Sequence, residues 1–122
     1  MNAKAQAVVK AAKANGAKQV VAPSILVPGM KRLFSMVLEA NTIEKVSAAI
    51  NLARKLKEDA KQVTDGFSSR YLMNVMIQVM AMLESVLQTL RFGGGVSVDQ
   101  PLALVSKKLD RVIRETLGHL PV

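Results

Sequence analysis

The sequence contains no cysteine and only one histidine among its 122 residues. The lack of cysteine excludes disulfide bonds, thiolate nucleophiles and cysteine metal sites. His119 lies in a terminal Gly-His-Leu-Pro segment and has no partner at metal-ligand spacing, so we expect a surface residue and not a general base or zinc ligand. We therefore predict a protein that is not an enzyme and has no catalytic residue, cofactor, metal site or small-molecule substrate.

A secretory signal and long apolar runs are also missing. The N-terminus does not show the order of charged region, apolar core and small-residue cleavage site that marks a signal peptide. No uninterrupted apolar run reaches the roughly 18 residues of a membrane span. We expect the protein to be cytoplasmic, or to reside in a particle assembled there.

Acidic residues are absent from the first 38 positions, which hold six of the seventeen basic residues. The net charge of the whole chain is +8, and the basicity belongs mainly to its N-terminal third. This asymmetry indicates a polyanion, an anionic surface or an acidic protein as a partner. The candidate polyanion-binding residues are Lys4, Lys10, Lys13, Lys18, Lys31 and Arg32.

Nucleic acid is one partner that this basic third could bind, because lysine-rich arms neutralise phosphates without reading bases. Aromatic residues do not alternate with the lysines and arginine is scarce, so we expect neither base stacking nor specific groove readout. Residues 2–14 lack a large apolar anchor, and we do not expect peripheral membrane contact. A solvated basic helix that only improves solubility is the remaining interpretation.

Two stretches show the periodicity of amphipathic helices. Apolar residues recur at intervals of three and four over residues 43–63 and over residues 102–116. An Asn41-x-x-Glu44 capping box precedes the first stretch, and Asp99 precedes the second. Charged residues four positions apart predict surface ion pairs, namely Arg54–Glu58, Lys55–Asp59, Asp110–Arg114 and Arg111–Glu115.

The N-terminal segment has a different character. Residues 2–14 are rich in alanine and lysine and predict a helix with a thin apolar face. Pro23 and Pro28 then interrupt a stretch that is too apolar for an idle linker, which predicts an extended arm that docks on another surface. Helical periodicity resumes at Met30.

The most apolar helix is predicted to follow Ser68 or Ser69, either of which could cap it, and to end at Phe92. Within it the stretch YLMNVMIQVMAML, residues 71–83, has no charge and holds four of the seven methionines. Apolar side chains cover most of its circumference and leave a narrow polar line, so we expect other copies or a partner to bury it. Core filling is the plainer role for its methionines. The candidate interface residues are Leu72, Met73, Met76, Met80, Leu83 and Leu87.

The loop after this helix, Phe92-Gly93-Gly94-Gly95, invites comparison with a phosphate-binding loop. Phosphate loops follow a strand and open a helix, usually with a Lys-Ser or Lys-Thr pair, whereas this loop follows a helix and lacks that lysine. We expect a hinge or a close approach of the backbone at an interface.

Together these patterns predict an all-α protein, a bundle of four to five helices with an extended apolar N-terminal arm. We divide it into residues 1–29, the basic helix and proline-containing arm, and residues 30–122, the helical core domain. The apolar excess predicts a non-enzymatic assembly or adaptor subunit that forms a homo-oligomer or packs into a larger complex, such as a phage-like or bacterial structural assembly. The alternative is a nucleic-acid-binding accessory protein that uses the basic N-terminal third.

Overall fold

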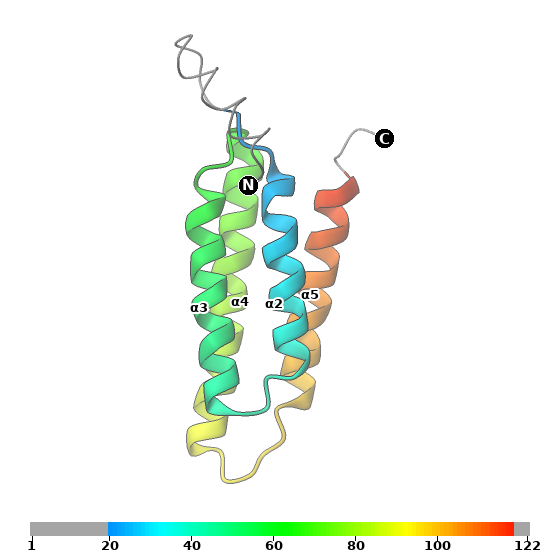
Figure 1. Ribbon diagram of the computed structural model, residues 1–122. Helices are drawn as coiled ribbons and strands as arrows, with labels where there is room; N and C mark the ends of the chain where they lie inside the picture. The colour runs from blue at the N-terminus through cyan, green and yellow to red at the C-terminus, as the bar shows by residue number, and fades with distance from the viewer. Residues whose placement is uncertain (1–19, 119–122) are drawn as a thin grey trace.

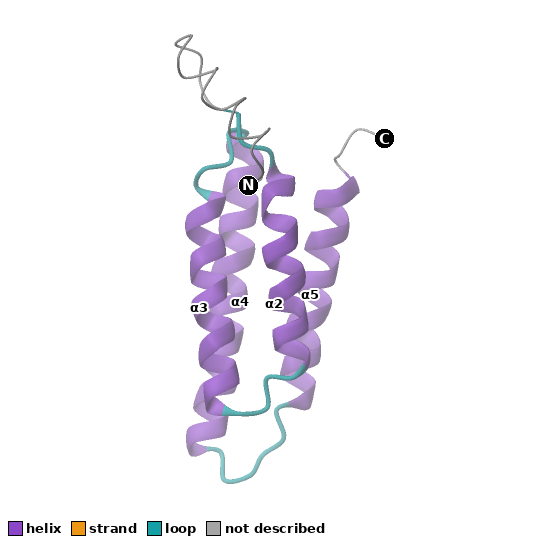
Figure 2. Cartoon of the chain, in the orientation of Figure 1, coloured by secondary structure: helices purple, strands orange, loops and turns teal. Residues whose placement is uncertain are grey.

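Helices account for most of residues 20–118, the part of the chain that the computed structural model describes (Figure 1). Within this range there are helices, turns and loops but no strand (Figure 2). The predicted all-α bundle is therefore confirmed. Its elements are the 3₁₀ helix η1 (Pro23–Leu26) and the α-helices α2 (Val27–Leu38), α3 (Ile43–Ala60), α4 (Gly66–Phe92) and α5 (Asp99–Gly118).

The four α-helices run alternately down and up the bundle (Figure 1). Each helix packs against two neighbours, α2 and α4 each lying between α3 and α5, and the diagonal pairs do not adjoin. Short connections between antiparallel neighbours give this arrangement. We call residues 20–26, 61–71 and 114–118 the upper end, and residues 38–45 and 91–99 the lower end.

The two predicted apolar seams form the core. Along α3 and the turn after it, every seam residue from Val46 to Val63 is buried, and only Ile43, at the start of the helix, is exposed. On α5 the seam from Leu102 to Thr116 is buried throughout. The periodicity of three and four therefore identified the inward faces correctly, because that spacing aligns side chains along one side of a helix.

The solvent exposure of α4 differs from the expectation. Its predicted polar line is exposed, but so are flanking residues such as Ile77, of which 48% is accessible. The prediction of burial on nearly all sides is thus wrong for the single chain. The buried apolar side chains of α4 face α3 and α5. Ile77 and Ala81 lie on the outer side of the helix, and isolated apolar side chains of this kind are ordinary at a protein surface.

Length and composition alone would allow one described helix, α4, to cross a membrane. The sequence has no uninterrupted apolar run of that length, because polar residues such as Asn74 and Gln78 break it. The core helix of a helical bundle meets the same criterion, and here one side of α4 packs against its own chain.

The predicted apolar arm does dock, but it becomes helical earlier than expected. The Val21 N–H donates to the Thr64 hydroxyl at 2.6 Å, and the Thr64 N–H donates to the Val21 carbonyl at 2.9 Å. Pro23 then opens η1, and Pro28 lies in the first turn of α2, where a helix does not need the missing N–H. Leu26 is buried, so the bundle core begins before residue 30.

The helix caps lie close to the predicted positions. The hydroxyl of Thr42, one residue after the expected cap, accepts a hydrogen bond from the third backbone N–H of α3 at 3.2 Å. Asp65 caps α4 by accepting from the Ser68 N–H at 3.1 Å. Ser69 has another role, since its hydroxyl donates to the Ala60 carbonyl at 2.8 Å and so satisfies the end of α3.

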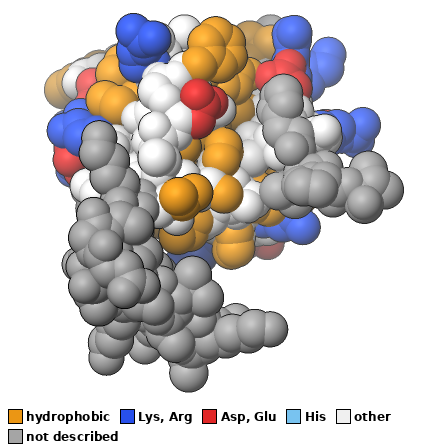
Figure 3. All heavy atoms as spheres, turned by 90° about the horizontal axis from the view of Figure 1, so that it is seen from above, with side chains coloured by type: hydrophobic (Ala, Val, Ile, Leu, Met, Phe, Trp, Pro, Cys, Tyr) orange, Lys and Arg blue, Asp and Glu red, His pale blue; other side chains and the backbone are white. Residues whose placement is uncertain are grey.

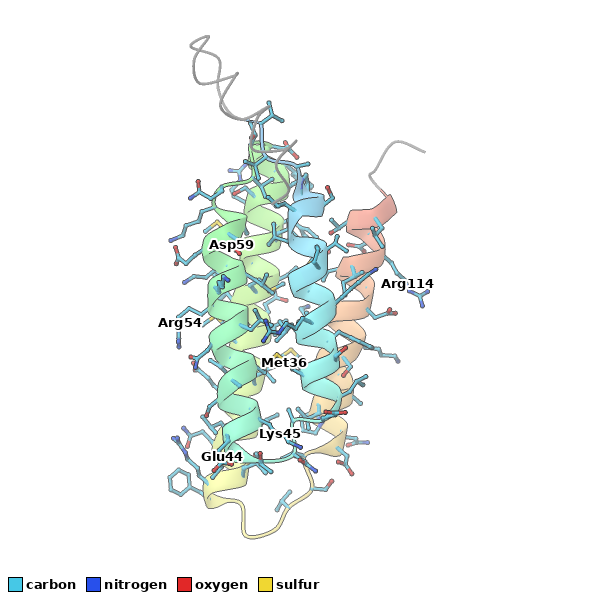
Figure 4. The ribbon with its side chains drawn as sticks, in the orientation of Figure 1. Met36, Glu44, Lys45, Arg54, Asp59 and Arg114 are labelled. Carbon is cyan, nitrogen blue, oxygen red and sulfur yellow. The ribbon has the colours of Figure 1, made fainter. Side chains whose placement is uncertain are left out.

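Charged side chains project from the flanks, as Arg54 and Asp59 do on α3 (Figure 4). Neither predicted ion pair on α3 is present. Arg54 instead donates to the Asn51 side chain at 2.9 Å, and Glu58 pairs with Lys61 at 3.0 Å. Residues three apart are neighbours on a helix just as residues four apart are, so the spacing alone does not choose between them.

Candidate functional site

The six candidate interface residues fall into two groups. Leu72, Met76 and Leu83 are buried in the core of their own chain and are not accessible to a partner in this structure. The other three are partly exposed and pack against the edge of that core, and they are Met73, Met80 and Leu87. A continuous methionine face for another chain is therefore not present.

The six candidate polyanion-binding residues are also divided. Lys31 and Arg32 are exposed on α2, and no acidic side chain of the described residues forms an ion pair with either. Lys4, Lys10, Lys13 and Lys18 lie outside the described residues, as does His119.

Large exposed hydrophobic side chains gather at the two ends of the bundle. Of the large hydrophobic side chains that are exposed in the described part of the chain, only Ile77 and Leu104 lie on the flanks of the bundle. The flanks thus resemble an ordinary protein surface, whereas the ends do not. The other exposed large hydrophobic residues are Val20, Ile25, Phe67, Tyr71 and Leu117 at the upper end, and Leu38, Ile43, Phe92 and Val96 at the lower end.

The upper end holds a pocket of about 490 Å³ between the start of α4 and the end of α5. Of the adjoining α-helix pairs, α4 and α5 share the least extensive contact, and this leaves room between them. Hydrophobic side chains and an acidic side chain are visible on this end (Figure 3). The pocket is lined by Pro23, Asp65, Phe67, Ser68, Tyr71, Leu72, Glu115 and Thr116.

A polar bridge crosses the pocket. The Tyr71 hydroxyl on α4 donates a hydrogen bond to the Glu115 carboxylate on α5. That carboxylate also pairs with Arg111 at 2.9 Å, one of the two ion pairs predicted on α5. Partial burial and the Glu115 carboxylate raise the pKa of Tyr71, so its phenol stays protonated at neutral pH and remains a donor. The second predicted pair, Arg114 with Asp110, is present at 3.1 Å.

The pocket is suited to binding an apolar group. Phe67 and Tyr71 are 75% and 37% exposed, while Leu72 and Thr116 are buried. The Thr116 hydroxyl donates to the Val112 carbonyl at 2.7 Å, so it has a partner already. An apolar or aromatic side chain placed here would cover both rings, and Glu115 would favour a hydrogen-bond donor or a cation beside it.

The sequence analysis did not identify this pocket. Its lining comes from residues more than forty positions apart, such as Tyr71 and Glu115, and only the tertiary structure brings them together. The one available signal is that two aromatic residues, Phe67 and Tyr71, lie at the start of the predicted helix, next to the point where the chain reverses.

The glycine loop after α4 lies at the lower end. Gly94 and Gly95 adopt φ angles of 61° and 91°, a left-handed conformation that favours glycine. A Cβ at Gly93 would lie 2.4 Å from the Thr89 carbonyl oxygen in the last turn of α4, and the expected hinge or interface contact of this loop stays a prediction. Over residues 20–118, no three histidine, cysteine or acidic residues are placed to hold a metal ion.

Comparison with protein-family models, with curated proteins and with solved structures finds no match to this chain.

Proposed function

We propose that this protein is a non-enzymatic assembly or adaptor subunit whose upper end binds another protein chain. The observation that supports the proposal most directly is the pocket beside α4 and α5, with Phe67 and Tyr71 exposed at its rim. Aromatic side chains of this kind are enriched at the centres of protein interfaces. The binding face therefore differs from the methionine stripe that the sequence suggested.

The distribution of charge on the bundle supports the same proposal. The Arg114–Asp110 pair lies on α5 beside the pocket, where Arg114 projects into solvent (Figure 4), whereas Glu115 of the Arg111–Glu115 pair lines the pocket itself. Charged residues are depleted from the centres of interfaces and common outside them. A partner that covers the pocket would leave the Arg114–Asp110 pair solvated and would lie against the Glu115 carboxylate.

A nucleic-acid-binding accessory protein is the second candidate. It is supported by the exposed pair Lys31 and Arg32, which lies on the acid-free N-terminal third of the chain. Binding of this kind would depend on phosphate neutralisation, so affinity for duplex and single strands would fall steeply with added salt. No retention on either nucleic acid at low salt would eliminate it.

Site-specific photo-crosslinking in the cells that make the protein tests the leading proposal. A photoreactive amino acid replaces Phe67 in one variant and Ile77 in a matched control, since both side chains are exposed on α4 but only Phe67 is at the end. We expect a protein adduct from position 67 and none from position 77. Equal labelling at both positions, or no adduct at 67, would contradict the proposal.

A further inference from the structure

We infer that residues 119–122 of the same chain, His-Leu-Pro-Val, cover the pocket when no partner is bound, with the Leu120 side chain against Phe67 and Tyr71. These four residues, which we call the tail, lie outside the described part of the chain. The inference rests on the proposed function and adds a regulation of the same site, because a partner chain would then bind by displacing the tail.

The tail leaves the bundle beside the pocket. Helix α5 ends at Gly118, and Glu115 and Thr116 in its last turn line the pocket. An extended chain spans about 3.3 Å per residue, so the four residues of the tail reach about 13 Å. Packed helices lie about 8–10 Å apart. The tail is therefore long enough to reach the α4 side of the pocket, where Phe67 and Tyr71 lie.

The helical phase of α5 directs the tail toward the pocket. The helix extends through Gly118, so position 119 follows Glu115 by four residues and Thr116 by three. Residues three and four apart share one side of a helix, and this is the side of α5 that lines the pocket. Pro121 disfavours the helical conformation at the residue before it, so we expect the chain to become extended at Leu120.

The tail carries both kinds of group that the pocket is suited to bind. Its leucine, proline and valine are apolar and would cover the exposed rings of Phe67 and Tyr71. His119 would bring a ring N–H to the Glu115 carboxylate, and a carboxylate can accept more than two hydrogen bonds.

Two other occupants fit the pocket less well. Residues 1–19 also join the upper end, but apart from Met1 their only apolar side chains larger than alanine are Val8 and Val9. A separate chain has to compete with a segment that is already attached. A short tether gives an effective concentration of about 1 mM, so the tail occupies the pocket ahead of a free chain of equal affinity at lower concentration.

Disulfide trapping in the full-length protein tests the inference, since the chain has no cysteine of its own. Phe67→Cys with Val122→Cys places one thiol at the rim of the pocket and one in the tail, and it leaves Leu120 in place. Arg114→Cys with Val122→Cys is the matched control, because the Arg114 side chain is 79% exposed and an unattached tail would meet it as readily.

We expect the first pair to form an intramolecular disulfide at least about tenfold faster than the control pair, because a disulfide requires the two Cα atoms to come within about 7 Å. Each rate is corrected for the reaction of the single-cysteine variants with a small thiol reagent. Adding Leu120→Asp to both pairs should make their rates equal, since a carboxylate would not enter the apolar pocket.

Four results would overturn the inference. Equal rates for the two pairs without Leu120→Asp would show that the tail is unattached, and an advantage that persists with Leu120→Asp would exclude Leu120 as the side chain in the pocket. Disulfide-linked dimers as the main product of the first pair would assign the pocket to a second copy. A faster disulfide of Phe67→Cys with Val9→Cys than with Val122→Cys would assign it to residues 1–19.

Photo-crosslinking at position 67 separates this inference from the proposed function. Leu120→Asp should raise the yield of the protein adduct severalfold, because the tail no longer competes, whereas Leu104→Asp on the exposed flank of α5 should leave it unchanged. An adduct whose yield does not respond to Leu120→Asp would refute the competition and leave the proposed function intact. No adduct in any variant would refute the proposed function, and the disulfide rates would still decide whether the tail covers the pocket.

Discussion

Replacing Met76 by alanine decides whether α4 is buried by its own chain or by other copies. Met76 lies in the middle of α4 and has no exposed surface in the single bundle. Truncation of a buried methionine to alanine costs about 2–5 kcal/mol, from the lost transfer free energy and the cavity that remains. The unfolding free energy of a domain of this size is about 5–15 kcal/mol, so the variant should fold with a large part of its stability lost.

Ile77→Ala provides a control at the adjacent position. About half of the Ile77 side chain is already exposed, so truncation removes at most about half of the 1.5–3 kcal/mol that burial of such a side chain contributes. Alanine also has the higher helix propensity, which offsets a few tenths of a kcal/mol. We expect the loss of stability at position 77 to stay below about 1 kcal/mol.

Urea unfolding followed by circular dichroism measures both effects. For a slope of about 1.5 kcal/mol per molar urea, a loss of about 3 kcal/mol lowers the midpoint by about 2 M. The difference in free energy between Met76→Ala and the wild type should be the same over an about 100-fold range of protein concentration, because the cavity lies within one chain. A difference that grows with dilution, or a Met76→Ala effect no larger than that of Ile77→Ala, would show that burial of this residue depends on association.

Two further predictions concern packing and titration. A Cβ at Gly29 would lie 2.5 Å from the buried Leu56 side chain, so Gly29→Ala should destabilise by about 1–3 kcal/mol. A Cβ added at Gly66 would have no atom within 4 Å, so Gly66→Ala should be neutral or stabilise by up to about 1 kcal/mol. Equal urea midpoints for Gly29→Ala and Gly66→Ala would contradict the packing argument. The chain's only tyrosine, Tyr71, should ionise above its ordinary pKa of 10.0 by phenolate absorbance, and Glu115→Gln should lower that pKa. Since the folded state holds this proton more tightly than the unfolded state, the contribution to stability is complete below pH 10 and is lost as the pH rises above it; an identical titration in Glu115→Gln would refute the coupling.

The fold was predictable from the sequence where periodicity extends over several turns. The α3 and α5 seams were predicted nearly residue by residue, because intervals of three and four specify which side of a helix faces inward. Boundaries were less certain, since Asn41 and Thr42 are both good caps and the hydrogen bond to Lys45 selects Thr42. Pro28 was misleading for a related reason, because a proline that breaks a helix interior is well suited to a first turn.

The environment of α4 could not be derived from its composition. Its apolar residues outnumber those of α3, but composition does not specify which of them the neighbouring helices cover. Met76 lies inside, whereas Ile77, one residue and about 100° further round the helix, is half exposed. Apolar residues also occupy the outer side of α4, so its sequence does not show a single apolar seam. Only the positions of α3 and α5 show which side of α4 faces the core.

Periodicity describes the flanks of a helix and gives no information about the ends of a bundle. At the ends the chain turns, so neighbours along the sequence no longer predict neighbours in space, and Tyr71 meets Glu115 across a pocket that neither segment contains alone. An aromatic side chain near a cap or at a last helical turn is therefore the local sign of an end surface, as Phe67 and Phe92 are on α4.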